Sequence, residues 1–204
     1  ASLPGMMPRL AFALSTSLVL SACATTAPVR DASGPVIIGI AAINDFHGAL
    51  EPPRQAVPAP DGKGGIVVVP SGGAAWLASA IDAVRAKYRH NLMVSAGDLI
   101  GGSSVTSSLF LDEPAIGAMN MIGLDFNAVG NHELDSGIEE LLRKQRGGCA
   151  QHTARKPCQV EQFAGAKFGF LAGNTLRPDG STLFPATAMR SFGKGRGRVK
   201  VGLI

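Results

Sequence analysis

Runs of apolar residues recur along the chain and predict five strands. The first run covers residues 36–43, and its unbroken β-branched character is typical of a strand buried on both faces. Further runs predict strands at residues 91–96, 125–129, 167–172 and 198–204. Because these runs are short and rich in Val, Ile and Phe, they favour strands over helices.

Amphipathic segments lie between the predicted strands. Apolar residues recur at spacings of three and four after the first strand: Trp76, Leu77, Ala80, Ile81 and Val84. This periodicity predicts a helix, and residues 114–122 and 138–145 predict two more. Asp112 is placed to cap the start of the helix at 114–122, and Gly123 to end it. Strands that alternate with helices predict βαβ units and an α/β fold.

The N-terminal residues have the layout of an export signal. An uncharged apolar run at residues 10–20 follows Arg9, and it is shorter than the roughly 20 residues that span a bilayer. Residues 20–23 (Leu-Ser-Ala-Cys) resemble the bacterial lipobox, in which Cys23 would become the lipidated first residue. The alternative is cleavage at the A-x-A pattern of residues 22–24, which would release a soluble periplasmic protein.

This layout divides the chain into three parts. We expect a lipoprotein-type signal peptide at residues 1–23, a flexible tether at 24–34 and a folded domain at 35–204. The expected location is the periplasm or cell envelope, with a lipid anchor at the outer membrane as the only membrane contact.

Composition and charge narrow the class of protein. The 204 residues are 46% hydrophobic and 17% charged, which excludes disordered, collagen-like and coiled-coil chains. The net charge of +4 is weak support for a nucleic-acid partner, and the basic segment at residues 193–199 lacks aromatic residues for base stacking. We therefore expect no nucleic-acid partner, and we expect a monomer.

Two cysteines lie in a polar segment of the predicted domain. In an oxidising compartment, Cys149 and Cys158 are expected to form a disulfide that closes a short loop. A metal site built from these two residues and His152 is the alternative, although the spacing matches no standard zinc pattern.

Metal-type donors follow three successive strands. Asp45 and His47 come after the first strand, Asp98 after the second, and Asn131 and His132 after the third. The carboxyl ends of parallel strands form the edge of an α/β sheet where ligands bind. Each motif alone also fits an ordinary turn or helix cap, but three together favour a site for divalent metal.

Four ordered blocks carry a family resemblance. Residues 44–48 (Asn-Asp-Phe-His-Gly), 97–103 (Gly-Asp-Leu-Ile-Gly-Gly-Ser), 119–125 (Met-Asn-Met-Ile-Gly-Leu-Asp) and 130–135 (Gly-Asn-His-Glu-Leu-Asp) closely resemble the bacterial 5'-nucleotidase family of calcineurin-like metallophosphatases. The resemblance implies an α/β fold, a four-layer αββα sandwich of two mixed sheets flanked by helices. It also implies that residues 35–204 are the N-terminal part of the metallophosphatase domain, truncated at its C-terminal side, with the substrate domain absent.

The resemblance assigns roles to the donor residues. Asp45 and His47 would bind a first metal, Asp98 would bridge two metals, and Asn131 would bind the second. The cofactors implied are two divalent ions, Zn, Mn, Co or Mg, which activate a hydroxide for attack on phosphorus. The implied activity is metal-dependent hydrolysis of nucleotides or other small phosphoesters.

The same resemblance gives two further residues a catalytic role. His132 would face the phosphate and stabilise the transition state or protonate the leaving group, and Asp135 would orient or charge its ring. Glu133 is interpreted as a structural acid rather than a ligand.

The donor set also leaves other functions open. Four donors are few for two metals, and the family supplies further histidines from chain beyond Ile204. The alternatives are a catalytically incomplete fragment, a surface lipoprotein with only a binding role, and a sulfur-oxidising hydrolase of thiosulfonate groups from the same superfamily.

Overall fold

The structure is a computed structural model that describes residues 35–53, 56–69 and 71–204. The expected signal peptide, Cys23 and the tether lie outside these residues. Among the helices of the described ranges, none is long and apolar enough to cross a membrane.

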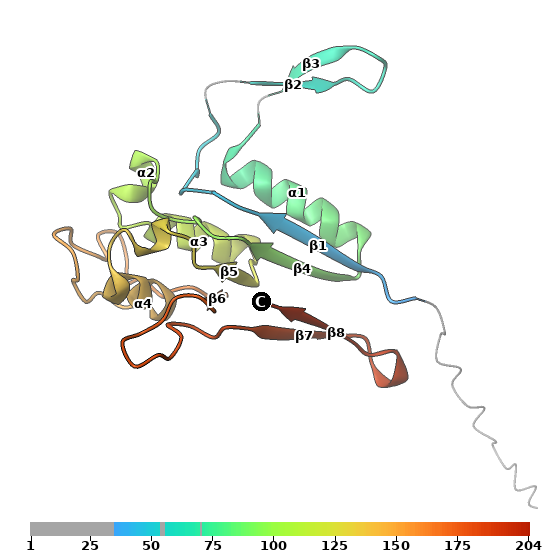
Figure 1. Cartoon of the computed structure of the whole chain (residues 1–204). Coiled ribbons are helices and arrows are strands. Elements are labelled where there is room, and N and C mark those ends of the chain that lie inside the picture. Colours follow the sequence, from blue (N-terminus) through green and yellow to red (C-terminus); the bar gives the residue numbers. More distant parts are fainter. Residues whose placement is uncertain (1–34, 54–55, 70) are drawn as a thin grey trace, which may run out of the picture. The chain divides into compact units, whose positions relative to one another are not determined.

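A parallel sheet of four strands forms the centre of the fold (Figure 1). Its strands are β1 (Ile38–Ile43), β4 (His90–Ser95), β5 (Phe126–Ala128) and β6 (Gly169–Leu171), in the order β1-β4-β5-β6. The segments that join neighbouring strands all contain helices. The segment before β6 also includes a long irregular stretch after α4. The parallel sheet confirms the expected α/β class.

Three helices match those expected from the sequence. They are α1 (Gly73–Lys87), α3 (Glu113–Ile122) and α4 (Ile138–Arg146), and α1 contacts β1, β4 and α3. Apolar residues of the helices pack with one face of the sheet in a single core, which includes Ile81, Met93, Ile116, Met119, Leu141 and Phe170. This core is the rigid base from which the ends of β1, β4 and β5 project.

Several short elements were not expected from the sequence. Two antiparallel pairs form, one from β2 (Val57–Pro60) and β3 (Ile66–Val69), the other from β7 (Ala188–Phe192) and β8 (Val199–Leu203). Of these four strands, only β8 was expected, as the strand at residues 198–204. Single-turn elements also occur at α2 (Val105–Ser108), η1 (His132–Leu134) and η2 (Gly195–Gly197). Apart from β8, these elements are three to five residues long, which is too short for a periodic apolar pattern to stand out.

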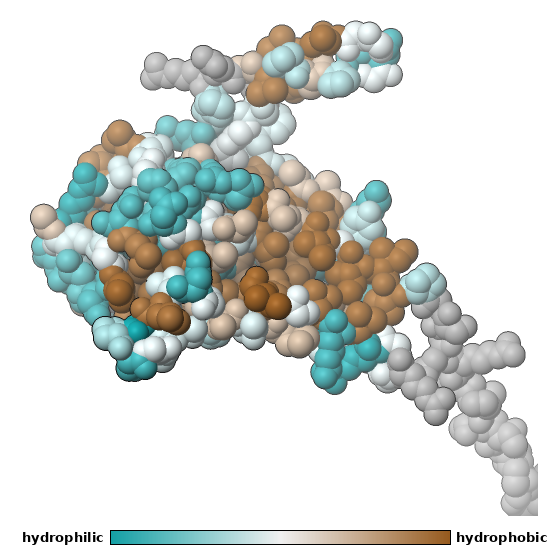
Figure 2. Space-filling model, viewed as in Figure 1, coloured by the Kyte–Doolittle hydropathy of each residue, from teal (hydrophilic) through white to brown (hydrophobic). Residues whose placement is uncertain are grey.

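The expectation that the first strand is buried on both faces was wrong. β1 is an edge strand of the sheet, and Ile40 is 58% exposed. The face away from the helices borders a cavity of about 1020 Å³, lined by Leu92, Val94 and Phe126 of the sheet and by Leu203 of β8. Figure 2 shows hydrophobic residues gathered over β1, β4 and the β7–β8 pair.

Asp112 does not cap α3 with its side chain, which corrects a second expectation. Its backbone is left-handed, with φ of 60°, whereas a capping residue usually has an extended backbone. The carboxylate instead accepts hydrogen bonds from Ser107 Oγ (2.7 Å) and from the Gly101 amide (3.1 Å). Gly123 ends the helix in the left-handed conformation, as expected.

Candidate metal centre

The ends of the parallel strands bring the expected donor residues to one edge of the sheet. Backbone hydrogen bonds continue the pairing of β1 and β4 beyond the strands, from the Asp45 amide to the Gly97 carbonyl (3.1 Å) and from the His47 amide to the Asp98 carbonyl (3.0 Å). The loop after β5 lies beside them, because the His132 amide donates to Asp98 Oδ1 (3.0 Å). Three loops are therefore fixed to one another at this edge.

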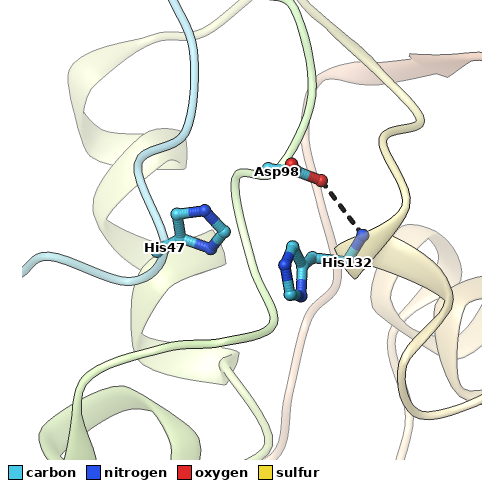
Figure 3. A group of neighbouring side chains, drawn as sticks. All are labelled: His47, Asp98 and His132. Carbon is cyan, nitrogen blue, oxygen red and sulfur yellow. Dashed lines mark hydrogen bonds between the residues drawn. The ribbon is translucent and has the colours of Figure 1, made fainter.

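His47, Asp98 and His132 form a cluster that could hold a metal ion (Figure 3). Each side chain offers one ligand atom, and these atoms all lie within 4.8 Å of one another. The two imidazole rings meet edge to face, with centroids 4.9 Å apart. All three residues are partly buried, so the cluster is open to solvent and to a ligand.

The backbone at these positions has an unusual conformation. Asp45, His47 and Asp98 have φ of 52°, 45° and 52°, in the left-handed region that non-glycine residues rarely adopt. Such strain costs about 1–3 kcal/mol per residue and gathers at functional sites. Gly102 permits the close approach of the rings, because a Cβ there would lie 3.3 Å from His47 Nδ1 and 3.4 Å from a ring carbon of His132.

The ring of His47 is held in a defined orientation. Its Nδ1 lies 2.7 Å from the Gly101 carbonyl oxygen, which can only accept a hydrogen bond. The proton therefore sits on Nδ1, and Nε2 keeps its lone pair for a cation, as is usual for metal-binding histidines. Asp112 holds the same residue from its other side, because its carboxylate accepts a hydrogen bond from the Gly101 amide.

Two further expected donors lie beside the cluster. Asp45 Oδ1 is 3.8 Å from His47 Nε2, and its side chain is 55% exposed. The other carboxylate oxygen of Asp45 accepts a hydrogen bond from the side chain of Asn44. Asn131 is exposed and directly precedes His132 at the start of η1. Both residues therefore lie at the carboxyl edge of the sheet, as expected from the sequence.

His132 and Asp135 form the expected pair. His132 Nδ1 lies 2.8 Å from Asp135 Oδ2, because the turn of η1 places residues three positions apart on one side. This hydrogen bond is the main cause that raises the pKa of His132 above its usual value. His132 also belongs to the donor cluster, so its ring is near enough to serve as a ligand or to face a substrate.

A loop closed by a disulfide lies next to the cluster. Cys149 and Cys158 are bonded, with Cα atoms 5.6 Å apart, so neither sulfur is free for the alternative metal site with His152. Residues 153–155 of this loop border a cavity of about 300 Å³, together with residues 101–103 and Asp135.

Sequence reasoning missed two contributors to the site. The Gly101 carbonyl and the Asp112 carboxylate orient His47 through contacts between distant positions, and no local motif marks such contacts.

Curated relatives support a link to nucleotide and phosphoester chemistry. No protein-family model matches the chain. An uncharacterised Acinetobacter calcoaceticus protein, from the region 5' of pqq-V, is 49% identical over 173 residues, which cover 82% of this chain and 84% of that protein. The Bacillus subtilis endonuclease YhcR is 36% identical over 152 residues, and the Haemophilus influenzae NAD 5'-nucleotidase is 31% identical over 133. The chain spans only 12% and 21% of the lengths of these last two.

Solved structures share the fold. The Haemophilus influenzae NAD nucleotidase matches with a TM-score of 0.55 at 23% identity, over 80% of this chain and 25% of that chain. The calcineurin-like phosphoesterase YfkN from Bacillus subtilis matches with a TM-score of 0.50 at 20% identity, over 80% of this chain and 46% of that chain. The sequence relatives show that the chain belongs to the bacterial 5'-nucleotidase family of calcineurin-like metallophosphatases, and the solved structures show that it shares their α/β fold.

Proposed function

We propose that this protein is a metal-dependent phosphoester hydrolase that resembles a 5'-nucleotidase, with a centre for two divalent ions. The observation that carries the proposal is the convergence of His47, Asp98 and His132 at the carboxyl edge of the parallel sheet. The relatives named for 5'-nucleotidase and phosphoesterase activity support the same chemistry.

The donor set fits divalent metal ions. Carboxylate oxygen and imidazole nitrogen are ligands that Zn, Mn, Co and Mg accept in proteins. Asp45 and His47 would hold one ion, Asp98 would lie between two, and the side-chain oxygen of Asn131 would reach the second. Divalent ions bound there would withdraw charge from the phosphoryl oxygens and activate a water molecule for attack on phosphorus.

The chain itself supplies a proton-transfer pair. Nδ1 of His132 is engaged in the hydrogen bond to Asp135. Nε2 therefore remains free to donate its proton to the leaving oxygen. The raised pKa of His132 favours the protonated ring that such a role requires. Asp135 acts through His132 and is therefore a positioning residue in this proposal.

Activity assays of the full chain test the proposal. We expect hydrolysis of a chromogenic phosphomonoester, and of adenosine monophosphate, that requires added Mn, Co or Zn and stops in chelator. Asp98→Asn should abolish turnover, because it removes the charge shared by the metals, whereas Asp82→Asn on the exposed side of α1 should not. A chain that hydrolyses no phosphoester with any of these metals would contradict the proposal.

A second candidate substrate class is the phosphodiester, which the identity to the endonuclease YhcR favours. A chromogenic phosphodiester in the same assay separates the two classes. Preference for the diester over the monoester would replace the nucleotidase assignment.

We also propose a location outside the cytoplasm, supported by the Cys149–Cys158 disulfide. Cell fractionation with detergent extraction tests this location and the proposed lipid anchor.

A further inference from the structure

Glu133 is a buried carboxylate that the proposed chemistry does not use. It is 1% exposed and accepts four hydrogen bonds, two at each oxygen. Oε2 accepts from the amides of Asp98 (2.9 Å) and Gly130 (2.7 Å), and Oε1 accepts from the amide of Leu99 (2.8 Å) and from Asn127 Nδ2 (3.0 Å). These four donors match the acceptor capacity of an ionised carboxylate.

The four donors belong to the segments that carry the candidate ligands. Asp98 and Leu99 lie in the loop after β4, Asn127 in β5, and Gly130 in the loop that leads to Asn131. A reciprocal bond joins the same loops, because Asp98 Oδ1 accepts from the His132 amide. The loops after β4 and β5 are thus bound to each other in both directions, with Glu133 at the centre.

The position of Asp98 depends on this arrangement. Its backbone is left-handed, and a hydrogen bond to its amide helps to hold that unfavourable conformation. The described residues place no basic side chain within ion-pair distance of Glu133, so backbone and amide donors satisfy its charge. Its carboxylate therefore acts on the two loops rather than as one half of an ion pair.

We propose that Glu133 is a positioning residue that fixes Asp98 and the Asn131–His132 segment relative to each other, and so preorganises the metal centre. The inference rests on the proposed function, since it assumes that these residues bind metal. Groups that orient metal ligands typically change metal affinity by 10- to 100-fold when they are removed.

The substitution Glu133→Gln tests the proposal at almost constant shape. A glutamine has only one carbonyl oxygen, so its NH2 group must face one of the two pairs of N–H donors, with which it can form no hydrogen bond. If the NH2 group faces Asp98 and Gly130, the hydrogen bonds from the backbone amides of these two residues are lost. If it faces Leu99 and Asn127, the Leu99 amide loses its acceptor, so a hydrogen bond to the loop after β4 is lost in either orientation.

Glu140→Gln is the matched control. Glu140 is also fully buried, and it binds Arg143 Nε and Nη2 at 2.9 and 2.6 Å, away from the metal cluster. Both variants should lower the melting temperature of the metal-free protein. Only Glu133→Gln should weaken the binding of Co²⁺, by about 10- to 100-fold in a titration followed by visible absorption.

The possible outcomes distinguish a failure of the Glu133 inference from a failure of the proposed function. If the wild-type chain binds Co²⁺ and Glu133→Gln binds it equally well, Glu133 is not a positioning residue and the proposed function stands. Equal weakening in Glu140→Gln would also overturn the inference, because the effect would then follow general stability. If the wild-type chain binds no Co²⁺, the proposed function fails and the inference fails with it.

A charge-swapped variant keeps the test valid if Glu133→Gln does not fold. In Asn127→Asp/Glu133→Gln, the new carboxylate can accept from the glutamine amide, which leaves the glutamine carbonyl for the amides of Asp98 and Gly130. We expect this variant to bind Co²⁺ within about tenfold of wild type. A folded swap variant that binds Co²⁺ more than 100-fold more weakly would contradict the assigned hydrogen bonds.

Discussion

At the scale of single residues, the candidate ligands are set by backbone geometry as much as by side-chain contacts. Asp45, His47 and Asp98 all have left-handed backbones, and each follows a strand of the parallel sheet. The rigid core beneath the strands carries the cost of these conformations, which would be unfavourable in an isolated loop. This arrangement brings the ligand atoms of His47 and Asp98 within 4.8 Å of each other before any metal binds, with Asp45 beside them.

His132→Ala tests the role of the histidine at the same scale. Loss of the proton-transfer group should lower turnover by about 10²- to 10⁴-fold and leave metal content unchanged. Metal analysis of the purified variant, beside phosphoesterase kinetics, checks both parts. Asp135→Asn is the companion variant, and it should lower turnover less, because the ring itself remains.

Loss of metal in His132→Ala would show instead that the ring is a ligand. The structure makes this a real alternative, because His132 lies in the same donor cluster as His47 and Asp98.

At the scale of elements, a buried ion cluster joins α4 to α3 and to the disulfide-closed loop. Arg143 is 2% exposed in its side chain and binds Glu140, Glu113 (2.7 Å) and the Gly148 carbonyl (2.9 Å). Burial alone would lower the pKa of Arg143, but the two carboxylates outweigh it and raise that pKa. Glu113 also accepts the amide of Cys158.

Arg143→Met should destabilise the protein by about 3–5 kcal/mol, because it leaves the fully buried Glu140 without its cation. Denaturant unfolding, followed by circular dichroism, measures this loss. The double variant Arg143→Met/Glu140→Gln should recover part of it, since no buried charge at position 140 then lacks a partner. A single variant as stable as wild type would contradict the structural role of the cluster.

Some of these elements could be predicted from the sequence and others could not. The apolar runs marked the five strands β1, β4, β5, β6 and β8, and the polar residues after three of them marked the donors, because parallel strands end at one edge. The β2–β3 pair and β7 lacked a clear period. The exposure of Ile40 depends on what covers the far face of the sheet, and no local pattern records that.

The hydrogen bonds that orient the side chains of the site could not be predicted from the sequence either. Glu133 could be interpreted as a structural acid, but its donors at positions 98, 99 and 127 are known only from the fold. Asp112 is placed in the sequence like a helix cap, and it instead holds Gly101, whose carbonyl orients His47. Such contacts join residues from different segments, so spacing along the chain does not indicate them.

At the scale of the whole molecule, the fold presents one edge for chemistry and one apolar sheet face. The donor cluster lies at the carboxyl ends of the strands, whereas the face lined by Leu92, Val94 and Phe126 borders the cavity beside β8. The chain spans 84% of its Acinetobacter relative but only 25% of the Haemophilus NAD nucleotidase structure. The proposal for this chain therefore concerns the metal centre, and not the substrate preference of the longer proteins.

Metal content per chain tests that assignment most directly. The purified full chain is loaded with Mn²⁺ or Co²⁺, freed of unbound metal by gel filtration and analysed by mass spectrometry, together with Asp98→Asn. We expect two ions per wild-type chain and a clear loss in Asp98→Asn, because in the proposed centre that carboxylate would hold both ions. A wild-type chain that retains no metal, or an Asp98→Asn variant that retains as much as wild type, would contradict the account.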